Sequence, residues 1–187
     1  NLGCSDTYST IVNVLPGPDA DFSMTPNPAL ALEDVSFTDL STGNGISGWY
    51  WNFGDDSGDN SQNPTHDYAN GGAYDVILTV TDNNGCVDST SQEILIALLP
   101  VLPTAFTPNG DGENDYFIIR GGPFTAVDFK VYSNWGELIF QTTEQAPGWD
   151  GTYQGEPAPL GVYTWTFEVE IPGGRYIIES GDVTLIR

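Results

Sequence analysis

The densest group of ligand-type oxygen atoms in the sequence lies between residues 109 and 115. The candidate ligands are Asn109, Asp111, Glu113 and Asp115. Their spacing follows the first half of a calcium-binding loop, with Asp111 at its fifth position. However, Thr107 and Ile118 occupy the first and twelfth positions, where the strongest acidic ligands belong. Because Asn, Asp and Gly also build tight turns without any ligand, a weak calcium site and a simple turn both stay open.

Other residues that could do chemistry are few. Three carboxylates gather in a polar stretch, and a solvated loop explains them better than a cation site: Asp55, Asp56 and Asp59. The single histidine, His66, cannot make a zinc site alone, so we expect it to pack. The sequence contains no Gly-x-Ser-x-Gly elbow, phosphate-binding glycine loop or cluster of paired cysteines. Carboxylates for a glycosidase pair are abundant, but they lie in short loops with no evident cleft. We therefore predict that the chain is not an enzyme.

The charge balance excludes several classes of partner. The chain has 26 acidic and 4 basic residues, a formal net charge of −22. Nucleic acid is excluded because phosphate binding requires a basic face, and an anionic lipid surface is disfavoured for the same reason. The longest apolar run, Ile94–Leu102, is shorter than the ~18 residues that a membrane span needs. We predict a secreted protein that does not itself span the membrane.

A short internal repeat links the start of the chain to its middle. The segment Asn1–Asp6 recurs as Asn84–Asp88, with Cys4 matching Cys86. We expect residues 1–15 to be the last strand of a preceding repeat, with the natural chain extending further upstream. The two cysteines then occupy equivalent places in successive repeats, too far apart for a mutual disulfide.

Residues 16–97 carry the alternation typical of half-buried strands. Segment Ile46–Phe53 places Trp49, Trp51 and Phe53 on one face. The expected strands are Ala20–Met24, Asp34–Leu40, Ile46–Phe53, Tyr74–Asp82 and Val87–Ile96. Such strands with turn residues between them predict an immunoglobulin-like sandwich.

Three motifs in this segment resemble a PKD (polycystic kidney disease) repeat. They are Trp51-Asn-Phe-Gly-Asp55, Asn63-Pro-Thr-His-Asp-Tyr68 and Gly72-Ala-Tyr-Asp-Val-Ile-Leu-Thr-Val-Thr-Asp82. The usual signature has Asp where Asn52 stands. The resemblance implies an Ig-like spacer or adhesive module of cell-surface proteins. We expect Trp51, Phe53, Tyr68 and Tyr74 to fill its core.

Residues 98–187 predict a second sandwich of about seven strands. The expected strands are Tyr116–Ile119, Val127–Tyr132, Glu137–Gln141, Gly161–Ile171, Arg175–Glu179 and Asp182–Arg187. The apolar junction Ala97–Pro103 contains two prolines, so we expect it to be stiff or packed. The predicted fold class is therefore all-β, with two Ig-like antiparallel β-sandwiches in tandem.

This second half resembles the gliding-motility-associated C-terminal domain, the type B sorting domain of the Bacteroidota type IX secretion system. The motifs are Thr104-Ala-Phe-Thr-Pro-Asn-Gly-Asp-Gly-Glu-Asn-Asp-Tyr-Phe117, Val131-Tyr-Ser-Asn-Trp-Gly-Glu-Leu-Ile-Phe140, Gly148-Trp-Asp-Gly151, Pro159-Leu-Gly-Val-Tyr163 and Gly181-Asp-Val-Thr-Leu-Ile-Arg187. The family commonly has Arg where Asn134 stands, which puts any docking role of that Arg in doubt here. Because members of the family end in the same way, we expect Arg187 to be the natural terminus.

The resemblance implies that the terminal domain directs a large protein across the outer membrane and holds it at the cell surface. The implied passenger is a giant adhesin of the gliding type, with PKD repeats as its stalk. The implied partners are an outer-membrane barrel of the PorP/SprF type and a PorV-like shuttle. Edge strands with unpaired backbone groups offer one physical route to such contacts. Our candidate exporter-binding residues are Thr184, Leu185, Ile186 and Arg187 of the last strand, with Trp135 and Gly136.

The alternative is a carbohydrate-binding accessory module of a secreted polysaccharide-degrading protein. Exposed aromatic rings can stack on sugar rings, and Trp135, Trp149 and Trp165 are the candidates. Burial of these tryptophans would count against the alternative.

Overall fold

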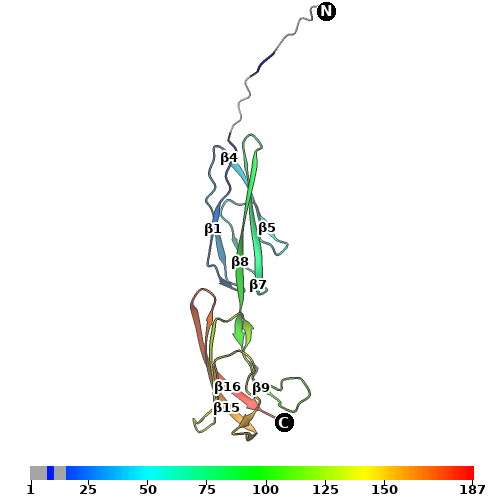
Figure 1. Cartoon of the computed structure of the whole chain (residues 1–187), viewed down its shortest axis with the longest axis vertical. Helices are drawn as coiled ribbons and strands as arrows, with labels where there is room; N and C mark the ends of the chain where they lie inside the picture. The colour runs from blue at the N-terminus through cyan, green and yellow to red at the C-terminus, as the bar shows by residue number, and fades with distance from the viewer. Residues whose placement is uncertain (1–7, 11–15) are drawn as a thin grey trace, which may run out of the picture.

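The computed structural model describes residues 8–10 and 16–187, and the second of these ranges forms two β-domains in succession along the long axis of the molecule (Figure 1). The first domain contains β1 (Phe22–Thr25), β2 (Ala29–Leu30), β3 (Val35–Asp39), β4 (Ile46–Asn52), β5 (Gly58–Asp59), β6 (Thr65–His66), β7 (Gly72–Asp82) and β8 (Val87–Val101). The second contains β9 (Ala105–Phe106), β10 (Arg120–Gly122), β11 (Ala126–Tyr132), β12 (Leu138–Thr142), β13 (Thr152–Tyr153), β14 (Glu156–Pro157), β15 (Gly161–Ile171) and β16 (Arg175–Leu185). Within the described ranges, no helix is long and apolar enough to cross a membrane. The predicted tail of a preceding repeat, residues 1–15, lies outside the described residues except for 8–10.

The first domain is a sandwich of two sheets. A three-stranded sheet has the order β1-β3-β6, and the larger sheet has the order β10-β8-β7-β4-β5, with β2 paired to β8. The long strands β7 and β8 form a hairpin whose register runs from Gly72↔Ile96 to Thr81↔Val87. Alternation along β7 turns Val76, Leu78 and Val80 inward, and all three side chains are completely buried.

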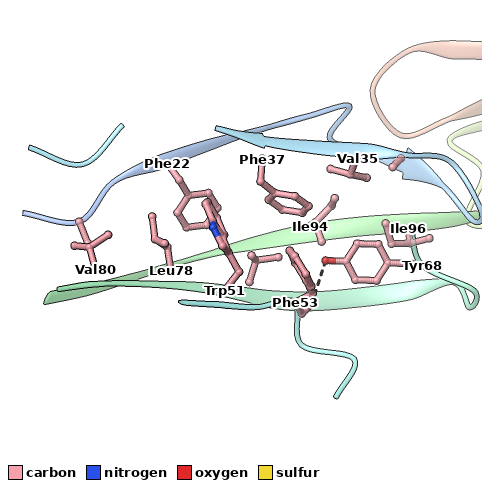
Figure 2. Packing of buried hydrophobic residues seen from close by; sticks show 13 residues of the cluster. Phe22, Val35, Phe37, Trp51, Phe53, Tyr68, Leu78, Val80, Ile94 and Ile96 are labelled. Atoms are coloured by element: carbon pink, nitrogen blue, oxygen red, sulfur yellow. Dashed lines mark hydrogen bonds between the residues drawn. The ribbon is translucent and has the colours of Figure 1, made fainter. Parts of the chain in front are cut away.

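Aromatic side chains fill the space between these two sheets (Figure 2). Trp51 is inaccessible to solvent and meets Phe22 edge to face at a centroid distance of 5.1 Å. Tyr68 is also buried, and its hydroxyl donates to the Phe53 carbonyl at 3.1 Å. The predicted core role of Trp51, Phe53 and Tyr68 is therefore confirmed, and Tyr74 packs against them while partly exposed.

The junction between the domains is a continuous strand. Strand β8 runs through the predicted boundary at residue 97 and ends at Val101, and β10 of the second domain pairs with it there. The tip of the β15–β16 hairpin reaches the first domain, where Arg175 donates to both carboxylate oxygens of Glu33 at 2.8 and 2.9 Å. The hydrogen bond from Arg175 lowers the pKa of Glu33. Because β8 and this ion pair join the domains, the junction is packed, as the prolines in the sequence indicated.

The second domain is built on one five-stranded sheet with the order β12-β11-β15-β16-β9. Neighbouring strands are antiparallel except β9, which runs parallel to the end of β16. The other side of its core is covered by short pieces: the β13–β14 hairpin and a single bridge between Phe117 and Trp149. The expected strand Tyr116–Ile119 is thus reduced to that bridge, and the two expected final strands form one continuous strand, β16. Proline and turn residues leave the opposite layer too broken for a full sheet.

Candidate functional site

The end of the second domain farthest from the first domain gathers most of the predicted interaction residues. We call this region the distal end: the β11–β12 turn, the segment 151–161 and the terminal Arg187. Strand β15 begins here at Gly161 and β16 ends here at Leu185, its register partner, whereas the opposite tip of the same hairpin touches the first domain. The sheet therefore carries the two predicted groups, Trp135-Gly136 and the chain end, to one side of the molecule.

The terminal strand is held on both sides. Thr184 and Leu185 pair with β15 and also with Ala105 and Phe106 of β9. Leu185 is 1% exposed and belongs to the core, so its side chain is not available to a partner. The last strand therefore does not present the free edge that we expected at residues 184 and 185.

The final residue folds back onto the domain. The Arg187 guanidinium donates to the Ala158 carbonyl at 3.0 Å and to the Gly151 carbonyl at 3.1 Å. These bonds tie the chain end to the segment that carries the β13–β14 hairpin. Next to it Ile186 is exposed. Ile186 and the backbone of Arg187 are therefore the parts of the chain end that a partner can reach.

Trp135 is the most exposed large hydrophobic side chain among the described residues of the second domain, at 90%. It lies in the turn between β11 and β12, where the Gly136 N–H donates to Ser133 and the Ser133 N–H donates to Glu137. Gly136 has φ 81°, a conformation that favours glycine, which explains the Trp-Gly order. No packing requirement explains an indole that projects into solvent from a tight turn.

A surface pocket of about 380 Å³ lies beside this turn. It is lined on one side by the turn, including Trp135 and Glu137, and on the other by the start of β15, including Leu160 and Val162. The Tyr153 hydroxyl donates to a Glu137 carboxylate oxygen at 2.7 Å, and this hydrogen bond raises the pKa of Tyr153. The pocket thus combines an exposed ring, apolar side chains and a carboxylate. Sequence reasoning missed its far wall, although the Pro159-Leu-Gly-Val-Tyr163 motif marked that segment.

The other two candidate tryptophans are inside the domain. Trp149 is 1% exposed and contacts Phe106 and Tyr163, so it cannot stack on a sugar. Trp165 is half-buried and lies parallel to Phe167 at a centroid distance of 5.5 Å. Of the three, only Trp135 offers an open ring.

The acidic loop 107–117 is organised by its own side chains. The Asp115 carboxylate accepts hydrogen bonds from the N–H groups of Asn109, Gly110 and Gly112 at 2.7–3.0 Å. These bonds, with that of Gly110 first, lower the pKa of Asp115. Asp111 accepts from the Glu113 N–H at 2.8 Å. Among the described residues, no group of three or more His, Cys, Asp or Glu side chains is arranged to hold a metal ion. The geometry accounts for the loop as a turn, and calcium binding by Asn109, Asp111, Glu113 and Asp115 stays a prediction.

His66 belongs to the packing of the first domain. Its ring stacks on Phe53 at 4.2 Å, and Nε2 lies 2.8 Å from an Asp55 carboxylate oxygen and 3.3 Å from Ser57 Oγ. Burial acts to raise the pKa of Asp55, but hydrogen bonds from Ser57 and His66 outweigh it and lower the pKa. Asp55 and Ser57 both contact Nε2 of His66, whereas in a catalytic triad the acid and the nucleophile contact different ring nitrogens. These three residues are therefore not arranged as a catalytic triad.

Comparison with known proteins identifies both halves. Residues 13–96 match the family model of the PKD domain, and residues 101–183 match that of the CHU_C type IX secretion signal domain. A curated relative, collagenase ColA of Clostridium perfringens (strain 13 / Type A), is 33% identical over 97 residues, which are 50% of this chain. The chain spans only 9% of that relative's length.

Solved structures also match the first half. The PKD1 domain of the Vibrio cholerae metalloprotease PrtV is 30% identical, with a TM-score of 0.40, over 43% of this chain and 98% of that one. The PKD1 domain of Vibrio anguillarum Epp is 27% identical, with a TM-score of 0.40, over 44% of this chain and 96% of that one.

The two matches cover consecutive parts of the chain, in the order that the motifs indicated. Both are non-catalytic modules, and a type IX secretion signal marks a secreted protein that this system sorts to the cell surface. The chain therefore consists of a PKD domain followed by a CHU_C-type type IX secretion signal domain.

Proposed function

We propose that this chain is the C-terminal part of a cell-surface adhesin of the gliding type from a member of the Bacteroidota. The terminal domain would deliver the protein to the type IX exporter and retain it at the outer membrane, while the PKD domain serves as stalk or spacer. The packed junction supports the spacer role, because β8 and the Arg175–Glu33 ion pair connect the domains without a flexible linker. In this proposal no part of the adhesin needs to be an enzyme.

The observation that carries the proposal is the exposed Trp135 beside its pocket at the distal end. Tryptophan is one of the residue types enriched among those that contribute most of the binding energy at protein interfaces. The distal end also faces away from the stalk, so a partner can approach it without meeting the first domain. We assign this surface, with Gly136, Ile186 and Arg187, to a PorP/SprF-type barrel and to a PorV-like shuttle.

The test is co-purification from the outer membrane of a bacterium that has type IX secretion. The whole chain is expected to retain a PorP/SprF-type barrel, and Trp135→Ala should reduce the recovered barrel by roughly tenfold or more. Tyr116→Ala is the matched control, because Tyr116 is a half-exposed aromatic residue elsewhere on the same domain. Equal recovery of the barrel with Trp135→Ala and Tyr116→Ala would contradict the assignment of this surface to the exporter.

Carbohydrate recognition is the second candidate, and the same indole favours it. An exposed aromatic ring next to a carboxylate and a phenol hydroxyl suits a sugar, whose C–H face stacks while its hydroxyls form hydrogen bonds. Glycan-array binding that disappears with Trp135→Ala would support this function. Binding of the barrel without binding of any glycan would favour export.

A further inference from the structure

The long strand β16 has one side without a strand partner over most of its length. It pairs with β15 throughout, from Ile171↔Arg175 to Gly161↔Leu185, and no bulge interrupts this register. On its other side β9 covers only Thr184 and Leu185. The stretch from Tyr176 to Asp182 is therefore an edge of the sheet.

The direction of the backbone groups along this edge follows from the bonds to β9. The Thr184 N–H donates to the carbonyl of Thr104, directly before β9, and the Ile186 N–H donates to the carbonyl of Phe106 in β9. Because successive residues of a strand direct their N–H and C=O groups to alternate sides, the outward groups belong to Tyr176, Ile178, Ser180 and Asp182. No backbone hydrogen bond to these outward groups is present in the described part of the chain. The edge therefore offers four donors and four acceptors in strand spacing.

This edge lacks most of the features by which proteins usually prevent strand addition. Edges are normally protected by charged side chains, especially lysine, by proline, by a bulge or by short length, and of these Tyr176–Asp182 has only the acidic Glu179 and Asp182. The opposite edge strand of the sheet, β12, has five residues and a register shift at Val131/Tyr132. In contrast, β16 pairs with β15 without a bulge, and the side chains of Tyr176 and Ile178 are 55% and 69% exposed. An accessible apolar edge of this length favours pairing with another strand.

A second observation lies at the same edge. Trp165 packs on Gly181, where an added Cβ would lie 2.7 Å from its ring. Its indole Nε1 is buried and has no hydrogen-bond partner among the described residues. Buried donors are nearly always satisfied, so an orphan donor calls for an explanation. This unsatisfied donor belongs to a ring that lies against Gly181 of the same edge.

We propose that Tyr176–Asp182 is a strand-addition site for an extended segment of another protein, in which basic residues alternate with apolar ones. The charge of the edge selects this occupant: Glu179 lies on the face of β16 opposite to Tyr176 and Ile178 and meets the basic residues, while Asp182 and, on β15, Glu168 and Glu170 add negative charge on the other face. Apolar residues of the occupant cover Tyr176 and Ile178. A second copy of this chain is disfavoured, because it carries the same carboxylates along its edge and a formal net charge of −22. The site is distinct from the distal end and does not depend on the export role.

The probe is a short synthetic peptide in which Lys alternates with Val, labelled for fluorescence anisotropy and added to the whole chain. We expect saturable binding, with slowed amide exchange at Tyr176–Asp182. The same peptide with Glu in place of Lys should bind at least roughly tenfold more weakly. No binding of the lysine peptide, equal binding of both peptides, protection only at β12, or a dimer of the chain at this edge would each overturn the proposal.

Two variants locate the site. Ser180→Pro removes an outward N–H without breaking the β15 ladder and should weaken binding by roughly tenfold, whereas Ser180→Ala should change it less than about twofold. Should Ser180→Pro fail to fold, Ile178→Lys repels the basic peptide from an exposed position and should weaken binding by a similar factor. Binding unaffected by these changes would contradict the assignment.

Discussion

Tyr68 illustrates how single side chains decide the stability of the first domain. Its ring fills the gap between the sheets, and its buried hydroxyl donates a hydrogen bond to the carbonyl of Phe53. Burial raises the pKa of Tyr68, which keeps the hydroxyl protonated as a donor.

Tyr68→Phe should lower the free energy of unfolding by about 1–3 kcal/mol, because the Phe53 carbonyl loses its buried donor. Urea denaturation of the whole chain measures the loss. Tyr50→Phe, at a half-exposed position on β4, is the control and should change little. A Tyr68→Phe protein as stable as the control would contradict the importance of this hydrogen bond.

Asp55 should make the first domain sensitive to acid. Its pKa lies below the ordinary value of 3.8 because hydrogen bonds from Ser57 and His66 outweigh the effect of burial. The folded state therefore binds this proton less readily than the unfolded state. Its contribution to stability is complete above the unfolded pKa and is lost as the pH falls through the folded pKa.

The expected result is that Asp55→Asn lowers the thermal midpoint at neutral pH and reduces its further fall between about pH 5 and pH 2. Melting curves over this range provide the measurement. The exposed Asp34 gives a matched control, Asp34→Asn. Parallel pH profiles for Asp55→Asn and the unchanged chain would show that this carboxylate does not carry the effect.

At the scale of elements, the opposite layer of the second domain depends on a close backbone contact. Gly148 lies against the Phe117 carbonyl, next to the bridge between Phe117 and Trp149, and no Cβ fits there. Gly148→Ala should therefore destabilise the chain by roughly 1–3 kcal/mol, as overpacking does. Gly48→Ala on β4 is the control, because its nearest neighbour would be at an ordinary 3.6 Å. Chemical denaturation that ranks the two variants equally would contradict this role.

Alternation of apolar and polar residues along the chain correctly predicted the strands that pair with strands nearby in the sequence. Trp51 and Phe53 on one face of a strand, and Val76 with Leu78 on another, identified both the strands and the first core. The expected strand at Tyr116–Ile119 failed because a segment needs a neighbour to pair with, and Phe117 finds only Trp149.

The candidate site was less accessible to sequence reasoning. Trp135-Gly136 could be selected from the sequence as an unusual aromatic turn. In contrast, no feature of the neighbouring sequence indicates that Trp149 is buried or that β9 pairs with Thr184 and Leu185. Both depend on contacts between residues far apart in the sequence. The free edge of β16 therefore became visible only with the strand order in hand.

On the scale of the whole molecule, the two domains are joined side chain to side chain as well as by the backbone. The Glu33–Arg175 pair is partly exposed, with side-chain exposures of 31% and 42%, so its contribution is modest. Glu33→Ala and Arg175→Ala should each cost about 0.5–1 kcal/mol, and the double variant should cost little more than either. A double-mutant cycle by denaturation measures the coupling. Simple addition of the two losses would mean that the ion pair contributes nothing.

The most direct test of the central claim, that the terminal domain is an export label, attaches the whole chain to a neutral reporter in a bacterium with type IX secretion. Protease accessibility of the reporter on intact cells is the readout. We predict that the reporter reaches the exterior, that removing residues 98–187 leaves it in the periplasm, and that removing residues 16–97 does not. A reporter that is displayed equally well without residues 98–187, or never displayed with them, would contradict the account.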